Sequence, residues 1–241
     1  MPEATLHPAM PATRADLARM IDHTILRPDA TRDAILRLCD ECIEHGFIAA
    51  CVQPVWVAAC ATRLAGSQSL VCTVVGFPHG ANTSRIKALE AAAAVKDGAR
   101  EVDMVIHHGD LLGSDPGAVE RDIRTVVESA KSASDAAQIK VILETAPLPD
   151  DRIIAACRAA ALAGADFIKT STGFHAAGGA TEKHVALLRS HSASASRTGG
   201  RMLVKASGGI RDIDAARRMI AAGADRLGTS ASVSILAGLN S

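Results

Sequence analysis

The stretch AGADFIKTSTG, residues 163–173, holds the pattern that decides the fold. An alanine-rich helical run ends at Gly164, where a helix C-terminus favours a residue with a left-handed backbone. The short apolar run FIK follows after two residues and is compatible with a strand. The same passage recurs with FIAACV after Gly46, AREVDMV after Gly98 and ADRLGT after Gly223. This repeat predicts a chain of alternating helices and strands.

Four further strands are predicted from apolar runs between these units, and helical patterns separate all the strands. The additional strands cover residues 20–26, 70–76, 140–144 and 202–206. The helices cover residues 29–45, 56–64, 85–97, 119–134, 150–163, 182–190 and 213–222. Eight alternating units in a chain of 241 residues predict an α/β fold, a single-domain TIM (β/α)8 barrel. An open doubly wound sheet is the alternative, but no GxGxxG motif follows the first strand.

The barrel is predicted to span residues 17–241, preceded by an N-terminal extension over residues 1–16. The segment SHSASASRTGG, residues 190–200, is polar and is predicted to be a solvated loop before the seventh strand. Neither segment indicates a second domain.

The composition argues against several classes of protein. Hydrophobic residues make up 48% of the chain, which allows a sizeable core, while aromatic residues make up only 2%. Lys and Arg together number 26, as do Asp and Glu, so no basic excess indicates nucleic-acid binding. No apolar run is long enough to span a membrane, and the N-terminus lacks signal-peptide features. We therefore expect a cytoplasmic protein that binds neither nucleic acid nor membrane.

The chain has six cysteines, which are expected to stay reduced in that compartment. Cys39 and Cys42 form a CxxC motif, but the surrounding pattern is helical and no second pair follows. We interpret them as small buried apolar residues rather than as a metal or redox site.

Polar residues occur where the predicted strands end. The fifth residue after each of the four repeat glycines is Cys51, Asp103, Lys169 or Gly228. Side chains alternate in direction along a strand, so these equivalent positions should share one facing, which we predict to be inward. In this architecture the chemistry lies at the C-terminal ends of the strands.

Lys169 and Lys205 each follow an apolar pair, FI and LV respectively, at the end of a predicted strand. The other lysines lie mostly on helical or surface patterns. Two lysines at neighbouring strand ends should repel each other, which together with burial lowers the pKa of one of them. A neutral amine can attack a carbonyl carbon and form an imine. The sequence favours this chemistry over a purely structural pairing of the two lysines with acids.

Three acids are candidates to assist the lysines. Asp103 could hydrogen-bond a lysine or position a water molecule as a proton shuttle, although a simple ion pair is the alternative. Asp22 could supply a further acid at the end of the first strand, but Asp often caps a turn at such a position. Glu144, at the end of the fifth strand, is equally ambiguous.

Glycines near the last strands indicate an anion site. Gly208-Gly209 follows the seventh strand, and Gly228-Thr229-Ser230 follows the eighth, each before a helix. Loops after strands seven and eight commonly bind phosphate in this fold. Gly173, after Lys169, could contribute as well. The histidines show no spacing typical of zinc ligands, so no metal is expected.

Seven segments together resemble deoxyribose-phosphate aldolase, in the order found in that family and across about residues 17–239. The most specific are FIKTSTGF, residues 167–174, and VKASGGIRD, residues 204–212. The others are DHTIL (22–26), GFPHG (76–80), EVDMVI (101–106), VILET (141–145) and RLGTS (226–230).

The resemblance implies a cofactor-free class I aldolase of deoxyribose phosphate breakdown. It implies that Lys169 forms the Schiff base, that Lys205 perturbs its pKa, and that Asp103 donates or accepts the proton. It implies phosphate contacts at Gly173, Gly208, Gly209, Gly228 and Ser230. Two positions depart from the family pattern, where His107 replaces an Asn and Ala231-Ser232 replaces a Gly or Ser pair.

Two other functions stay open from the sequence. One is a different Schiff-base aldolase that acts on keto-sugar phosphates or keto acids. The other is an inactive sugar-phosphate-binding barrel, although such a module would need no paired lysines.

The expected partners are small sugar phosphates and aldehydes. Barrels of this kind are often dimers, which makes a homodimer one candidate assembly, but no patch in the sequence decides the oligomeric state. Cys51, which faces the site, could react with aldehydes, but a small core residue is the simpler interpretation.

Overall fold

The computed structural model describes residues 8–113, 115, 117–192 and 201–240. Its centre is a closed barrel in which eight parallel strands pair in sequence order and β8 pairs with β1. The predicted barrel is therefore confirmed, and the open sheet is wrong. The strands are β1 (Ile21–Ile25), β2 (Ala49–Val52), β3 (Leu70–Val75), β4 (Glu101–Val105), β5 (Gln138–Ile142), β6 (Phe167–Lys169), β7 (Leu203–Ser207) and β8 (Arg226–Thr229).

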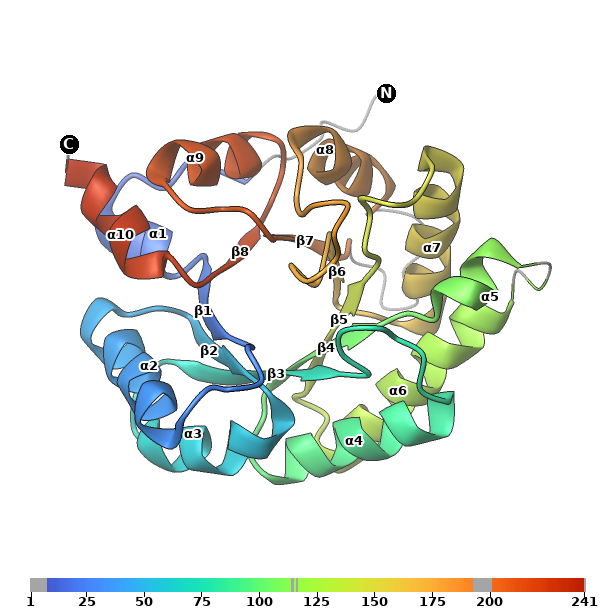
Figure 1. Cartoon of the computed structure of the whole chain (residues 1–241), viewed down its shortest axis with the longest axis horizontal. Coiled ribbons are helices and arrows are strands. Elements are labelled where there is room, and N and C mark those ends of the chain that lie inside the picture. The colour runs from blue at the N-terminus through green and yellow to red at the C-terminus, as the bar shows by residue number, and fades with distance from the viewer. Residues whose placement is uncertain (1–7, 114, 116, 193–200, 241) are drawn as a thin grey trace.

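Helices surround the strands on the outside of the barrel (Figure 1). The main helices are α2 (Arg32–His45), α3 (Val57–Arg63), α4 (Ser84–Lys96), α6 (Ala118–Ala133), α7 (Asp150–Ala163), α8 (Glu182–His191) and α9 (Ile213–Ala221). Shorter ones are α1 (Arg14–Ala18), α5 (His108–Leu112), α10 (Ser232–Ala237) and the 3-10 turns η1 (Pro54–Trp56) and η2 (Gly238–Asn240).

The glycine of the repeat does what the sequence predicts. Gly46 and Gly164 cap α2 and α7 with left-handed φ values of 73° and 85°. Gly98 and Gly223 have φ values of 114° and 113° just after α4 and α9. A residue with a Cβ is strained in this region, so glycine lets the chain leave the helix and enter the next strand at once.

The core has two parts. The larger apolar cluster fills the space between the strands and the surrounding helices. A smaller cluster lies on β2 and β3 and at the end of β1, and it consists of Leu26, Ala49, Cys51, Cys72 and Val74. All six cysteines are free and buried, as the sequence analysis expected.

Some predicted boundaries need correction. Ser190 and His191 belong to α8 rather than to the loop predicted at 190–200, of which residues 193–200 lie outside the described part of the chain. Helix α1 runs across the predicted boundary between residues 16 and 17, so that division stays a prediction. No helix in the described ranges is long and apolar enough to cross a membrane.

Candidate active site

The strand register brings the predicted lysines and aspartate together inside the barrel. Lys169 on β6 pairs directly with Lys205 on β7, and Asp103 on β4 pairs with Lys140 on β5. Directly paired residues on parallel strands point to the same face. All four side chains are buried, with Lys169 the most accessible at 3% exposure. The predicted inward facing of Asp103 and Lys169 is therefore confirmed.

Asp103 lies at the centre of this group. Its Oδ2 accepts hydrogen bonds from the amines of Lys169 and Lys205, each at 2.7 Å. Its Oδ1 accepts one from Lys140 at 2.9 Å. Burial alone would raise the pKa of Asp103, but the three lysines outweigh it and hold that pKa well below its usual range. Asp103 is therefore an ionised acceptor in contact with three amines.

Direct repulsion between Lys169 and Lys205 does not describe this site, because the Asp103 carboxylate bonds both. Burial lowers the pKa of Lys205, yet the carboxylates of Asp103 and Asp22 outweigh it and raise that pKa. Lys205 therefore keeps its proton. Of the two lysines, only Lys169 is left as a candidate for a free amine.

Four charged residues that sequence reasoning missed or discounted extend the cluster. Asp22 is inside β1 rather than in a turn, and it contacts Lys205 and the Arg226 Nη1, the latter at 2.6 Å. Glu101 accepts from Lys140 at 2.6 Å and from the Arg226 Nη2 at 3.1 Å. The contacts thus close a ring of six alternating acids and bases, which we call the charge ring: Asp103, Lys140, Glu101, Arg226, Asp22 and Lys205.

Two sets of side chains in the barrel offer donors that a metal could use, namely Cys51, Cys72 and Asp103, and Asp22, Cys72 and Glu101. The Lys140 amine already bonds the Cys72 sulfur at 3.3 Å as well as both acids on β4. Ammonium groups compete for these lone pairs and repel a cation. The residues therefore suit ion pairing better than metal ligation.

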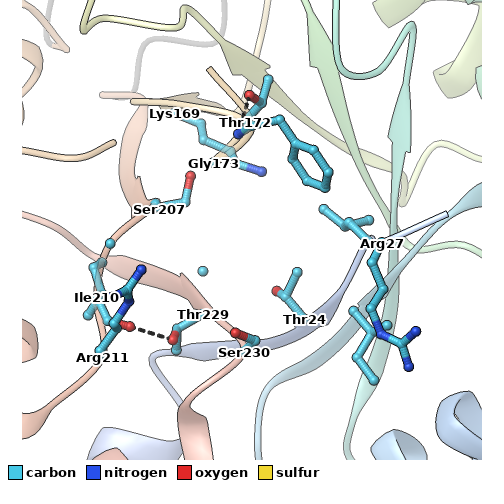
Figure 2. Close-up of a pocket in the computed structure, with 16 residues that line it drawn as sticks. Thr24, Arg27, Lys169, Thr172, Gly173, Ser207, Ile210, Arg211, Thr229 and Ser230 are labelled. Atoms are coloured by element: carbon cyan, nitrogen blue, oxygen red, sulfur yellow. Dashed lines mark hydrogen bonds between the residues drawn. The ribbon is translucent and has the colours of Figure 1, made fainter. Parts of the chain in front are cut away.

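Above the charge ring, a cavity of about 510 Å³ opens at the C-terminal ends of the strands. Lys169 is the only one of the three barrel lysines that lines it among the described residues. All the predicted phosphate residues line it too: Gly173, Gly208, Gly209, Gly228 and Ser230. Figure 2 shows the Lys169 amine pointing into the cavity from one end, with Ser230 and Arg211 at the other.

Two of these glycines have local reasons to lack a side chain. Gly228 lies within β8 rather than after it, and a Cβ there would meet the Lys205 Cε at 3.0 Å. A Cβ on Gly208 would meet Ser171 Oγ at 2.7 Å, and its φ is 88°. Gly228 therefore makes room for the lysine, whatever it contributes to binding an anion.

Arg211 is a cavity residue that the sequence analysis did not single out, although it lies in the motif VKASGGIRD. It is exposed, and its guanidinium has no ion pair within the ranges that the structure describes. Arg27 also lines the cavity but pairs with Asp29 at 2.8 Å. Arg211 is thus the cation best placed to meet an anionic ligand near Ser230.

Glu144 supports the loop that follows Lys169. It comes two residues after the end of β5, has a left-handed φ of 54°, and is buried. Its carboxylate accepts hydrogen bonds from the backbone N–H and the hydroxyl of Thr172. The Thr172 hydroxyl in turn accepts from the N–H of Phe174 at 3.1 Å. Glu144 therefore holds both sides of Gly173 in place.

The two departures from the family pattern make local contacts outside the charge ring. His107 directs its ring at Asp110, with a distance of 3.0 Å from Nδ1 to the carboxylate, and is 39% exposed. Ala231 donates its N–H to the Thr229 hydroxyl at 2.9 Å, which continues the turn after β8. Neither side chain replaces a group of the charge ring.

Known proteins match both the sequence and the fold. A family model described as DeoC/LacD family aldolase matches residues 17–240. A deoxyribose-phosphate aldolase of Listeria monocytogenes is 50% identical over 222 residues, which cover 92% of this chain and 95% of that protein. One of Geobacillus sp. is 49% identical over 223 residues, which cover 92% and 96%. The tetrameric deoxyribose phosphate aldolase structure of Aeropyrum pernix matches with a TM-score of 0.84 and 36% identity, covering 95% of this chain and 93% of that one.

Proposed function

The chain belongs to the DeoC/LacD family of aldolases, and from this membership we propose that it cleaves 2-deoxy-D-ribose 5-phosphate reversibly. The products are acetaldehyde and D-glyceraldehyde 3-phosphate. The family resemblance carried by the sequence motifs is confirmed. The roles assigned below to individual residues are our proposal.

The observation that carries this assignment is the position of the Lys169 amine. It lies on the cavity and bonds an ionised carboxylate, whereas Lys140 and Lys205 are fully buried below it. An amine must reach the substrate carbonyl to form an imine. Lys169 is therefore the nucleophile of the class I reaction.

The reaction begins when the Lys169 amine attacks C1 of the open-chain sugar and water leaves, which gives a protonated imine. Asp103, through a water molecule, removes the proton from the C3 hydroxyl. The C2–C3 bond breaks, its electrons move into the imine to give an enamine, and C3 becomes the aldehyde of glyceraldehyde 3-phosphate. The enamine is then protonated at C2, and water hydrolyses the new imine to acetaldehyde and free Lys169.

The other end of the cavity suits the phosphate of this substrate. Arg211 supplies a charge, and the turns at Gly208-Gly209 and Ser230 supply backbone and hydroxyl groups. Holding the phosphate away from the reacting carbons aligns C1 with Lys169.

Replacing Arg211 with alanine is expected to raise the KM for 2-deoxyribose 5-phosphate by about tenfold, because a charge-assisted hydrogen bond to phosphate is lost. The KM for unphosphorylated 2-deoxyribose should stay nearly constant. Arg27→Ala is the matched control, since Arg27 lines the same cavity but is already paired. Equal effects of Arg211→Ala on both sugars would contradict a phosphate contact.

Borohydride reduction in the presence of 2-deoxyribose 5-phosphate tests the proposed function directly. We expect a stable adduct on the peptide that carries Lys169, found by mass analysis, together with acetaldehyde release in the absence of borohydride. A panel of keto-sugar phosphates and keto acids would show whether another substrate reacts faster. A folded protein that binds the sugar phosphate without adduct or turnover would point to a binding barrel instead.

We also propose that no cofactor takes part, since the lysine itself supplies the electron sink. A cytoplasmic location is supported by the six free, buried cysteines, which suit a reducing compartment. A homodimer stays a candidate assembly.

A further inference from the structure

The charge ring lies almost entirely out of reach of a substrate. Its members come from β1, β4, β5, β7 and β8, and five of the six are fully buried, while the Arg226 side chain is 8% exposed. None of the six lines the cavity. Arg226 is the member farthest along the contacts from Lys169, because it reaches Asp103 only through two other members of the ring. Glu101 is one contact nearer and reaches Lys169 through Lys140 and Asp103.

Acids and bases alternate around the ring, with three of each. The pKa values of Asp22 and Asp103 are held low, and those of Lys140, Lys205 and Arg226 are raised, because the opposite charges outweigh the effect of burial. With three carboxylates paired to three basic groups, the ring is electrically neutral when every member is ionised. Lys169 bonds Asp103 but is not a member of the ring. It is a fourth basic group, and no fourth carboxylate of the ring balances its charge.

The other titratable or charged groups near Lys169 are two thiols, one carboxylate and two arginines. Cys51 on β2 and Cys72 on β3 are buried thiols beside Asp103. Burial raises the pKa of Cys72, which keeps it neutral, whereas a hydrogen bond with Cys72 lowers the pKa of Cys51. Glu144, in the loop after β5, accepts hydrogen bonds from the backbone N–H and the hydroxyl of Thr172. Arg27 and Arg211 lie on the cavity rim and add only positive charge.

We propose that the neutral charge ring makes Lys169 the one amine in the barrel that gives up its proton, and that Glu101 and Arg226 are positioning residues that set this balance from below. A protonated Lys169 would add one uncompensated charge to a buried site, which is costly. Releasing that proton restores neutrality and leaves the nucleophilic amine on the cavity. The inference rests on the proposed function, because it assumes that Lys169 forms the imine.

Charge-removing variants at the two positions should have opposite effects. Glu101→Gln leaves the ring with a positive charge, so Lys169 should lose its proton at lower pH. Arg226→Gln leaves a negative charge, so Lys169 should hold its proton to higher pH. For charges roughly 10 Å apart at an effective dielectric constant of about 20, each shift should be on the order of one pH unit. The double variant Glu101→Gln/Arg226→Gln restores neutrality and should return the profile close to that of the native protein.

The measurement is the initial rate of reductive alkylation of Lys169 by acetaldehyde and cyanoborohydride over a pH series, read by peptide mass analysis. The pH dependence of kcat/KM with 2-deoxyribose 5-phosphate provides the second readout. Asp122→Asn is the matched control, because Asp122 forms a buried ion pair with Lys87 outside the ring at 2.7 Å. It should lower stability without moving the profile. Cys51→Ala tests whether that thiol holds the balancing charge, and it should also leave the midpoint in place.

Opposite shifts that cancel in the double variant would support the proposal. Shifts of the same sign, an unmoved midpoint, or an equal shift in Asp122→Asn or Cys51→Ala would overturn it. If thermal denaturation shows that one single variant is unfolded, the direction of the pH shift in the other single variant still decides. A native protein whose Lys169 is not alkylated at any pH would overturn the proposed function as well, whereas a reactive native Lys169 with unmoved variants overturns only this inference.

Discussion

Replacing Lys169 with alanine is expected to abolish aldol cleavage, with a loss in kcat of about 10⁴-fold or more. No second amine can take over, because Lys140 and Lys205 are fully buried and bonded to carboxylates. The variant removes the one base that lacks an acid of its own, so the charge ring stays intact. We therefore expect the thermal unfolding midpoint to change little while turnover disappears, as measured by coupled detection of glyceraldehyde 3-phosphate.

The same variant should still bind the phosphorylated sugar, since Arg211 and the glycine turns are unchanged. Protection of the protein against thermal unfolding by 2-deoxyribose 5-phosphate would show this binding. Turnover within tenfold of the native rate would mean that another group forms the covalent intermediate, and peptide mapping after borohydride reduction would locate it.

Replacing Lys205 with leucine is expected to reduce kcat severely, by about 10²- to 10⁴-fold, because the proton relay through Asp103 is disturbed. Unlike Lys169→Ala, this variant should also lose stability. Lys205 is fully buried and bonds Asp22 and Asp103, so its loss leaves two buried carboxylates short of a partner. Breaking a buried ion pair in this way costs roughly 3–5 kcal/mol.

Lys87→Leu separates the two effects of that substitution. Lys87 is also fully buried, bonding Asp122 and the carbonyl of Val105 between the helices and the barrel. Its replacement should destabilise the fold to a similar extent, but kcat of the folded fraction should stay near the native value. A Lys205→Leu enzyme with near-native kcat would remove Lys205 from the mechanism.

The sequence supports most of the fold because its signals are local. The glycine that ends each helix and the apolar run that follows lie within ten residues of each other, so both can be recognised without knowing the tertiary structure. Helix α5, His108–Leu112, was not predicted, because five residues are too few for a helical period to be visible. The predicted position of Lys169 at the end of a strand is confirmed for the same local reason.

The charge ring was only half visible in the sequence. Lys140 falls in the predicted strand 140–144, in agreement with β5, but the sequence analysis does not single it out as a charged residue inside the barrel. The two-residue period of a strand carries the missing signal, since Glu101 precedes Asp103 by two positions and Arg226 precedes Gly228 by two. The period predicts which way each side chain faces, but it does not predict which acid pairs with which base. The contact of Asp22 with Arg226 exists only because β8 closes on β1.

That closure has a consequence during synthesis of the chain. Asp22 and Arg226 are 204 residues apart, so at roughly 5–20 residues per second the ribosome delivers the second about 10–40 s after the first. Until Arg226 is made, Asp22 lacks one of its two partners, and the ring of charges that surrounds Lys205 cannot close. An unfinished chain therefore cannot assemble the reactive amine, and a product that stops before β8 should be inactive and open to proteolysis.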